Sequence, residues 1–237
     1  MATVVHRALD GSHVSFSVDA DLGAPLTAFG FAFPRGWRVS HAFNLYPGSR
    51  CDELLGLMDV SYPEIEYRIH DEIPLKDGRL RLAHVRRPVA TGGTREYTFA
   101  AWEDDHASLS TAIYGKVKEA RALFEALEFS PSGGSIAVHS PIDQSIRPLR
   151  CLKEIPGHGL LEISPRVPTV DATLPLTAGA PVAGGELYER TARAPVYVLV
   201  TETAAVTISA FATGQDPRAL AESLYVRWSD QTARAVA

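Results

Sequence analysis

The chain has 237 residues, a net charge of −5 and a hydrophobic fraction of 46%. These values are ordinary for a globular protein and leave room for one large domain or two small ones. The modest negative charge argues against a nucleic-acid partner, because nucleic acids select basic surfaces. No stretch has the apolar length of a signal peptide or a membrane span, so we expect a cytoplasmic protein with no membrane contact. The excess of arginine over lysine, together with abundant alanine, suggests a bacterial source.

Cysteine usage narrows the chemistry. Only Cys51 and Cys151 are present, and the chain has no CxxC motif. A zinc ribbon or a thioredoxin-type site is therefore not expected. Two reduced thiols fit a cytosolic protein, although the sequence leaves a bridge between them open.

The first 90 residues predict strands separated by turns. Asp10-Gly11 is typical of a β-hairpin, and an alternating apolar strand over residues 28–33 runs into Pro34. A short helix is expected over residues 52–58, and a half-exposed strand over residues 64–69.

Residues 95–130 predict a compact unit of two strands and one helix. The strands are joined by the polar run Glu103-Asp104-Asp105-His106, which suits a hairpin loop. Gly115 ends the second strand, and beyond it apolar residues recur at helical spacing over residues 116–128.

A similar pattern returns in residues 194–229. Two alternating strands are followed by Gly214, which stands where Gly115 stood in the first copy. Leu220, Leu224 and Trp228 then recur at i, i+4 and i+8, which predicts a helix over residues 217–228. A tandem duplication and a chance repetition of a common unit both stay open.

These patterns predict an α+β fold in which antiparallel sheets are each backed by a C-terminal helix. The run Ser130-Pro131-Ser132-Gly133-Gly134-Ser135 has the composition of a linker. We therefore expect an N-terminal module over residues 1–130 and a C-terminal module over residues 131–237, with a merged single domain as the alternative.

One segment resembles a known family. The run FAFPRGWRV, with Pro34, Gly36 and Trp37, and the helix end from Leu123 to Phe129 resemble the Mog1/PsbP-like fold over about residues 28–130. The resemblance implies a binding, assembly or accessory protein more readily than an enzyme. It carries over no catalytic residue.

Candidate catalytic residues are few. The chain lacks the GxSxG, GxGxxG and Walker motifs, so no nucleophile, dinucleotide or nucleotide site is predicted. Glu64, His84, Asp105 and His106 are the first side chains to test for acid–base chemistry. A solvated turn or strand edge is the alternative interpretation of each acidic group. We expect no metal and no cofactor.

Aromatic side chains provide another candidate site. They can line a pocket between sheet and helix, with ordinary core packing as the alternative. These pocket candidates are Trp37, Tyr97, Trp102, Tyr114 and Tyr197.

The function predicted from these patterns is a non-catalytic binding or assembly protein. A sheet face or cleft would recruit a protein partner or a small apolar ligand. The alternative is a small-molecule enzyme of bacterial secondary metabolism, such as a cyclase, isomerase or hydrolase, with an apolar pocket. A homo-oligomer built through exposed sheet edges is also possible.

Overall fold

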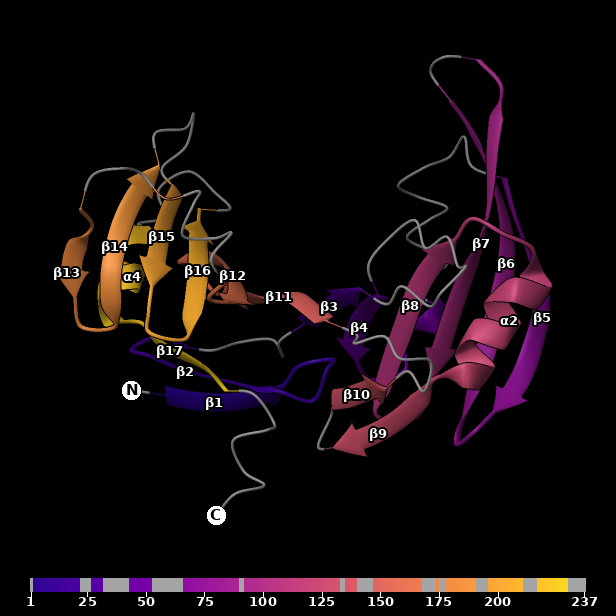
Figure 1. Cartoon of the computed structure of the whole chain (residues 1–237), viewed down its shortest axis with the longest axis horizontal. Helices are drawn as coiled ribbons and strands as arrows, with labels where there is room; N and C mark the ends of the chain where they lie inside the picture. Colours follow the sequence, from indigo (N-terminus) through magenta and orange to yellow (C-terminus); the bar gives the residue numbers. More distant parts are fainter. Residues whose placement is uncertain are drawn as a thin grey trace. The chain divides into compact units, whose positions relative to one another are not determined.

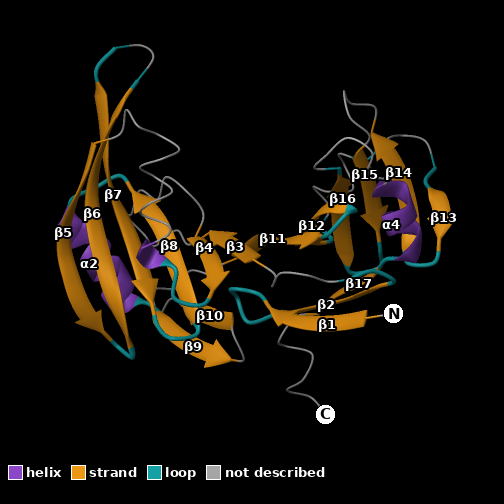
Figure 2. Cartoon of the chain, turned by 180° about the vertical axis from the view of Figure 1, so that it is seen from behind, coloured by secondary structure: helices purple, strands orange, loops and turns teal. Residues whose placement is uncertain are grey.

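The computed structural model shows a chain that is mostly β-structure (Figures 1 and 2). In its described part it has seventeen strands and two helices, besides the helical residues Cys51 and Asp52. The prediction of an α+β fold, with a trailing helix behind each sheet, is therefore wrong. The described part comprises residues 2–21, 27–31, 43–52, 66–89, 92–132, 135–139, 147–167, 174, 178–190, 196–210 and 217–229.

The chain divides into two compact units. A central unit contains the continuous segment 29–147, and a terminal unit contains both ends of the chain, residues 1–28 and 148–237. The sequence placed a single boundary at residue 130, whereas these units meet at residues 28/29 and 147/148. Residue 130 instead lies in β9 (Glu128–Ser132), which pairs with β10 (Ser135–His139) in a hairpin.

The glycine-rich stretch was interpreted as a linker because its composition is also that of a turn. Ser132 and Ser135 are paired across the hairpin, so only Gly133 and Gly134 separate the two strands. A glycine-rich composition therefore does not by itself mark a boundary between domains.

The central unit is built on an antiparallel sheet with the order β4-β8-β7-β6-β5. Its strands are β4 (Phe43–Pro47), β5 (Glu66–Leu75), β6 (Gly78–Pro88), β7 (Thr94–Glu103) and β8 (Ala107–Ile113). A further strand, β3 (Thr27–Phe31), spans the boundary between the two units.

The helix predicted after Gly115 is present as α2 (Val117–Ala126) and packs against β6 and β7 (Figure 2). Glu119 supports its first turn, because its carboxylate accepts the backbone N–H of Lys116 at 2.7 Å. The buried residues of α2 include Leu123 and Phe124. Each large apolar side chain buried in this way contributes roughly 1.5–3 kcal/mol.

Trp102 is the centre of this core. Its side chain is 1% exposed and stacks on Phe129, with ring centroids 4.4 Å apart. Its indole N–H donates to the Leu75 carbonyl oxygen at 3.0 Å, so the buried polar atom is satisfied. Of the two interpretations of Trp102, core packing is the one that the burial supports.

The terminal unit carries a second antiparallel sheet and a smaller three-stranded sheet. The larger sheet runs in the order β13-β14-β15-β16-β12-β11, and the smaller in the order β1-β2-β17. The larger contains β11 (Arg147–Ile155), β12 (Gly159–Pro165), β13 (Ala180–Val182), β14 (Gly185–Arg190), β15 (Val196–Val200) and β16 (Ala204–Ser209). The smaller contains β1 (Ala2–Arg7), β2 (His13–Val18) and β17 (Tyr225–Ser229).

The second predicted helix is only partly correct. Helix α4 (Pro217–Ser223) contacts β13, β15 and β16, but the chain then becomes strand β17. Trp228 lies on that strand opposite Val14, and its indole N–H donates to the Ser12 hydroxyl oxygen at 2.9 Å. The two β-β-α blocks of the expected duplication therefore differ, because the second continues into a strand of the small sheet.

Candidate functional site

The hairpin between β6 and β7 projects beyond the sheet of the central unit (Figure 1). β5 pairs with β6 as far as Arg86, and β8 pairs with β7 as far as Thr98. Toward the tip of the hairpin, the pairs Arg87–Arg95 and Pro88–Thr94 have no third strand beside them among the described residues. We call residues 86–96 the β6–β7 arm, of which residues 86–89 and 92–96 are described.

The arm carries more positive than negative charge. Arg87 and Arg95 face each other across the hairpin, and both are exposed. The Arg95 guanidinium donates to the Tyr114 hydroxyl at 3.0 Å and lies 5.5 Å from the centre of its ring. Arg86 pairs with Glu96, with 3.2 Å between Nε and Oε1. Three guanidiniums and one carboxylate therefore occupy the arm.

The register of β6 and β7 separates the predicted site residues onto two faces. His84 is opposite Thr98, and Val85 is opposite Tyr97. Because side chains alternate along a strand, His84 and Tyr97 lie on opposite faces of the sheet. Tyr97 meets Tyr114 edge-on, with ring centroids 6.4 Å apart. The sequence-predicted imidazole and the tyrosine pair therefore do not form one site.

His84 lies instead beside the start of α2. An open hollow of about 450 Å³ is lined by His84, Glu96, Gly115, Lys116, Val117 and Glu119. The His84 Nε2 atom is 3.9 Å from the Glu96 Oε2 atom, which is an ion-pair distance only when the ring is protonated. We call this the His84 hollow. It combines one imidazole, two carboxylates and one ammonium group at the base of the arm.

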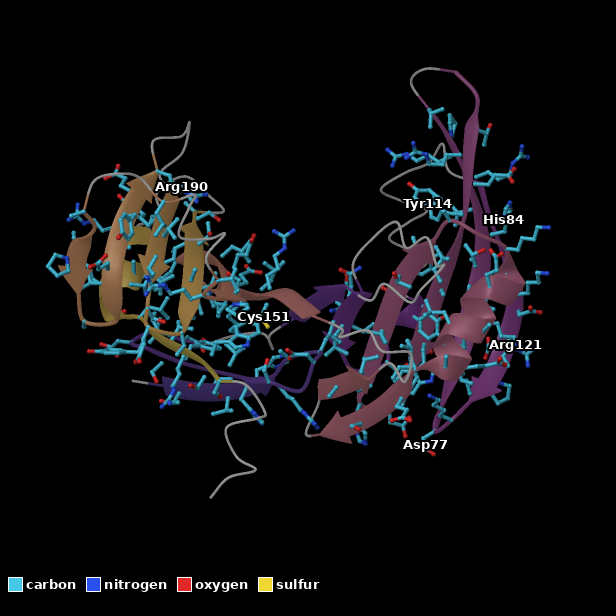
Figure 3. All side chains as sticks on the ribbon, viewed as in Figure 1. Asp77, His84, Tyr114, Arg121, Cys151 and Arg190 are labelled. Carbon is cyan, nitrogen blue, oxygen red and sulfur yellow. The ribbon has the colours of Figure 1, made fainter. Side chains whose placement is uncertain are left out.

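A second hollow lies at the opposite end of the same two strands. It has a volume of about 270 Å³, is open to solvent, and lies at the Asp77 end of the unit, away from Tyr114 (Figure 3). We call it the Glu103 hollow. Its lining residues are Ser49, Asp77, Gly78, Arg79, Glu103, Asp104 and Asp105.

Glu103 is the buried centre of this second hollow. The residue is 2% exposed, yet its carboxylate is fully engaged. It accepts the Ser49 hydroxyl at 2.8 Å, the Cys51 backbone N–H at 2.8 Å and the Arg79 Nε at 2.7 Å. Arg79 also reaches Glu103 through Nη2 at 2.6 Å. The carboxylate thereby attaches the segment after β4 to the start of β6.

These contacts outweigh the cost of burial. Burial alone raises the pKa of Glu103, but the hydrogen bonds from Cys51, Ser49 and Arg79 lower that pKa to about 2. The Glu103 carboxyl is therefore ionised at neutral pH and is not a proton donor there. The pKa of the Cys51 thiol is raised by burial and by the neighbouring Glu103 carboxylate, so this thiol stays protonated and unreactive.

The remaining catalytic candidates are separated. Asp105 and His106 are exposed in the β7–β8 turn, where the Asp104 carboxylate accepts the N–H groups of His106 and Ala107 at 2.8 and 2.7 Å. At a rise of about 3.3 Å per residue, this turn is about 20 Å along β7 from His84. Glu64 lies outside the described residues. No convergent acid–base pair forms among the three that are described.

The pocket candidates are dispersed as well. Trp102 is in the core, Tyr97 and Tyr114 are at the arm, and Tyr197 is on β15 of the terminal unit. Trp37 lies outside the described residues. The four candidates that the structure describes do not line one pocket.

Both cysteines are free and buried. Burial raises the pKa of the Cys151 thiol, as it does for Cys51. Within the described part of the chain, no group of three or more His, Cys, Asp or Glu side chains is placed to hold a metal ion. No helix in that part is long and apolar enough to cross a bilayer.

Sequence reasoning missed Glu103, Ser49 and Arg79 as one cluster. The only local signal was that Glu103 directly follows three buried residues of β7, Ala100, Ala101 and Trp102. The partners come from residues 24 and 54 positions away. Pairing across such distances cannot be read from local periodicity.

Comparison with protein-family models, with curated proteins and with solved structures found no match for this chain. The resemblance of residues 28–130 to the Mog1/PsbP-like fold therefore stays a prediction.

Proposed function

We propose that this chain is a non-catalytic binding and assembly protein whose partner surface is the β6–β7 arm. The observation that carries the proposal is the exposure of Arg87 and Arg95 on strand pairs that have no described neighbouring strand. An exposed hairpin costs conformational entropy and gains little burial in an isolated chain. A partner that covers it would offset that cost.

The chemistry of the arm supports a protein surface with carboxylates. Guanidinium groups form paired hydrogen bonds with carboxylates, and Arg and Tyr are enriched where proteins recognise each other. Arg95 and the 37%-exposed Tyr114 provide both groups side by side. The separation of His84 from Asp105 and His106 supports a binding role over acid–base catalysis.

The test is affinity capture from native cells with immobilised full-length chain, to which a tagged copy of the same chain is added. The wild type should retain at least one protein in roughly equal amount. The variant Arg87→Glu/Arg95→Glu should lose it, whereas the control Arg218→Glu, an exposed arginine of α4, should retain it. Equal capture by the arm variant would contradict the proposal.

A second candidate is a small-molecule enzyme that uses the His84 hollow. Its volume of about 450 Å³ is within the range of ligand pockets, and it holds an imidazole near two carboxylates. Turnover of a small molecule that is lost in His84→Ala, with no stoichiometric partner captured, would favour this candidate and overturn the first.

A further inference from the structure

The three-stranded sheet of the terminal unit ends on strand β1, which has a strand on only one side in the described part of the chain (Figure 1). One face of this sheet is buried, through Val14, Phe16 and Val18 of β2. Val5 lies on the other face, opposite Ser15. At 65% exposure, Val5 is the most exposed of the large hydrophobic side chains that the structure describes. An exposed apolar residue therefore stands near the middle of a strand at the edge of a sheet.

The hydrogen-bond pattern of β1 determines which of its backbone groups point away from β2. The Ala8 N–H donates to the Ser12 carbonyl oxygen at 2.8 Å, so the groups of this pair face inward. In an antiparallel pair, hydrogen-bonded positions alternate with positions whose N–H and C=O groups point outward. This alternation places the backbone groups of Thr3, Val5 and Arg7 on the outer side of β1. None of them has a hydrogen-bond partner there among the described residues.

The opposite edge of the same sheet is closed. Val14 directs its backbone groups toward β1, so those of Trp228, its neighbour on β17, point away from β2. The Trp228 N–H donates to the Thr203 hydroxyl oxygen at 2.9 Å. A side chain from the turn between β15 and β16 thus satisfies this edge, whereas β1 has no such contact in the described part of the chain.

Other outermost strands have features that discourage pairing with another chain. β5 has a bulge between Ile69 and Asp71 and also carries Pro74. β13 has three residues and includes Pro181, and β9 includes Pro131. Bulges, prolines and short length keep edge strands from pairing with other chains. β1 has six residues, no proline and no bulge, so its edge is open to a further strand.

The outward groups of β1 complement those of a second β1 strand that runs antiparallel to it. With the two-fold axis at Val5, each Val5 pairs with its own copy, and Thr3 pairs with Arg7 of the second copy. Every outward donor and acceptor is then used, whereas any other register leaves some of them unpaired. A register centred on Arg7 would also oppose two guanidiniums, which is unfavourable. The centred register instead covers the exposed Val5 side chains with each other, because paired residues lie on the same face of a sheet.

We propose that this chain forms a two-fold symmetric dimer in which β1 pairs with β1 of a second copy, so that two three-stranded sheets become one continuous sheet. Backbone hydrogen bonds supply the affinity, as in other cases of strand addition. The contact is isologous, so growth stops at two copies. One pair of six-residue strands is a small interface, so the association is weak and depends on concentration. This surface belongs to the terminal unit and is additional to the β6–β7 arm.

Sedimentation velocity of the full-length chain from about 1 µM to about 1 mM tests the dimer. The wild type should shift from monomer to dimer and no further. Val5→Pro should weaken dimerisation at least about tenfold, because it removes an outward N–H that the pairing with β2 does not use. Val5→Lys should weaken it by a similar factor, because two ammonium groups would then lie opposite each other. The control Tyr225→Lys changes the 43%-exposed tyrosine of the same face, on β17, and should dimerise like the wild type.

Cysteine cross-linking tests the register. In the centred pairing the Cα atoms of the two Val5 residues are about 5.5 Å apart, which is within the range of a disulfide. Val5→Cys should therefore form a covalent dimer under mild oxidation, and the native cysteines do not interfere because both are buried. The two Thr3 residues are offset by four positions, about 13 Å along the strands. The matched variant Thr3→Cys should therefore stay without a cross-link.

Several outcomes would overturn the proposal. They are a chain that is monomeric at every concentration, dimers that ignore both Val5 substitutions, assemblies larger than a dimer, and equal cross-linking through Thr3→Cys. A monomeric chain that binds another protein through β1, and loses it in Val5→Pro, would mean that the edge serves a different partner. The arm variant Arg87→Glu/Arg95→Glu should dimerise like the wild type, so failure of the proposed function leaves this dimer standing. Loss of the dimer in the arm variant would contradict pairing through β1.

Discussion

The two ends of the β6–β7 hairpin are built from the same strands but for different purposes. At the Glu103 end, a buried carboxylate accepts hydrogen bonds from two other segments of the central unit, the chain after β4 and the start of β6. At the arm end, Arg87 and Arg95 lie opposite each other and are both exposed, and the arm lacks the burial that surrounds Glu103. One hairpin therefore holds segments of the fold together at one end and exposes basic side chains at the other.

The largest effect is expected at Glu103. Replacing Glu103 by Gln keeps its shape but removes the charge that Arg79 and the Cys51 N–H require. We expect a loss of about 2–4 kcal/mol in the free energy of unfolding, measured by denaturant titration. Glu96→Gln on the arm is the matched control, and its effect should stay within about 0.5 kcal/mol because Glu96 is exposed. Equal losses in the two variants would remove the distinction between the ends.

The second-largest effect is expected from acid, which should lower the stability that Glu103 contributes. The folded-state pKa of Glu103 is about 2, below its ordinary value of 4.5. The unfolded chain therefore binds more protons between these values, so the contribution is complete above pH 4.5 and disappears as the pH falls toward 2. About 3 kcal/mol is at stake. The free energy of unfolding, measured from pH 6 to pH 2, should fall more steeply in the wild type than in Glu103→Gln.

Gly78 offers a test of packing at the same end. A Cβ at this position would contact the Glu103 carbonyl oxygen and would lie 2.7 Å from the Trp102 ring. Neither the backbone nor the stacked indole can move freely, so Gly78→Ala should cost about 1–3 kcal/mol. Gly92→Ala in the arm is not a matched control, because Gly92 has a positive φ of 85°. Ser110→Ala on buried β8 is a better comparison, and an equal loss there would mean that crowding at Gly78 is unimportant.

The smallest effect is expected on the arm. Arg87→Glu should change the free energy of unfolding by no more than about 0.5 kcal/mol, because Arg87 is exposed and exposed substitutions cost little. Thermal unfolding of the variant beside the wild type measures this. A large loss would mean that the arm packs against the rest of the unit and is not free for a partner.

The sequence correctly predicted those elements that depend on the spacing of neighbouring residues. The strands around Asp105, the end at Gly115 and the helix α2 follow from alternation and helical spacing in residues 95–128. The second helix was extended too far, because Leu220, Leu224 and Trp228 fit a helix as well as a strand. Val226 and Trp228 are buried while Tyr225 and Arg227 are exposed, which is the period of a strand.

The candidate site was less predictable than the fold. His84 was singled out from the sequence, but its neighbours Glu96 and Glu119 depend on strand register and on the position of α2. Glu103 was assigned to a solvated turn, because a carboxylate beside Asp104 and Asp105 has that character. The carboxylate is buried and pairs with Arg79, which the register of β6 with β7 brings opposite it.

Amide hydrogen exchange along β6 and β7 tests the difference between the two ends most directly. In dilute protein at high salt, we expect slow exchange in residues 79–85 and 97–103 and fast exchange in the described residues of the arm. Arm amides that are as protected as residues 79–85 would contradict the account.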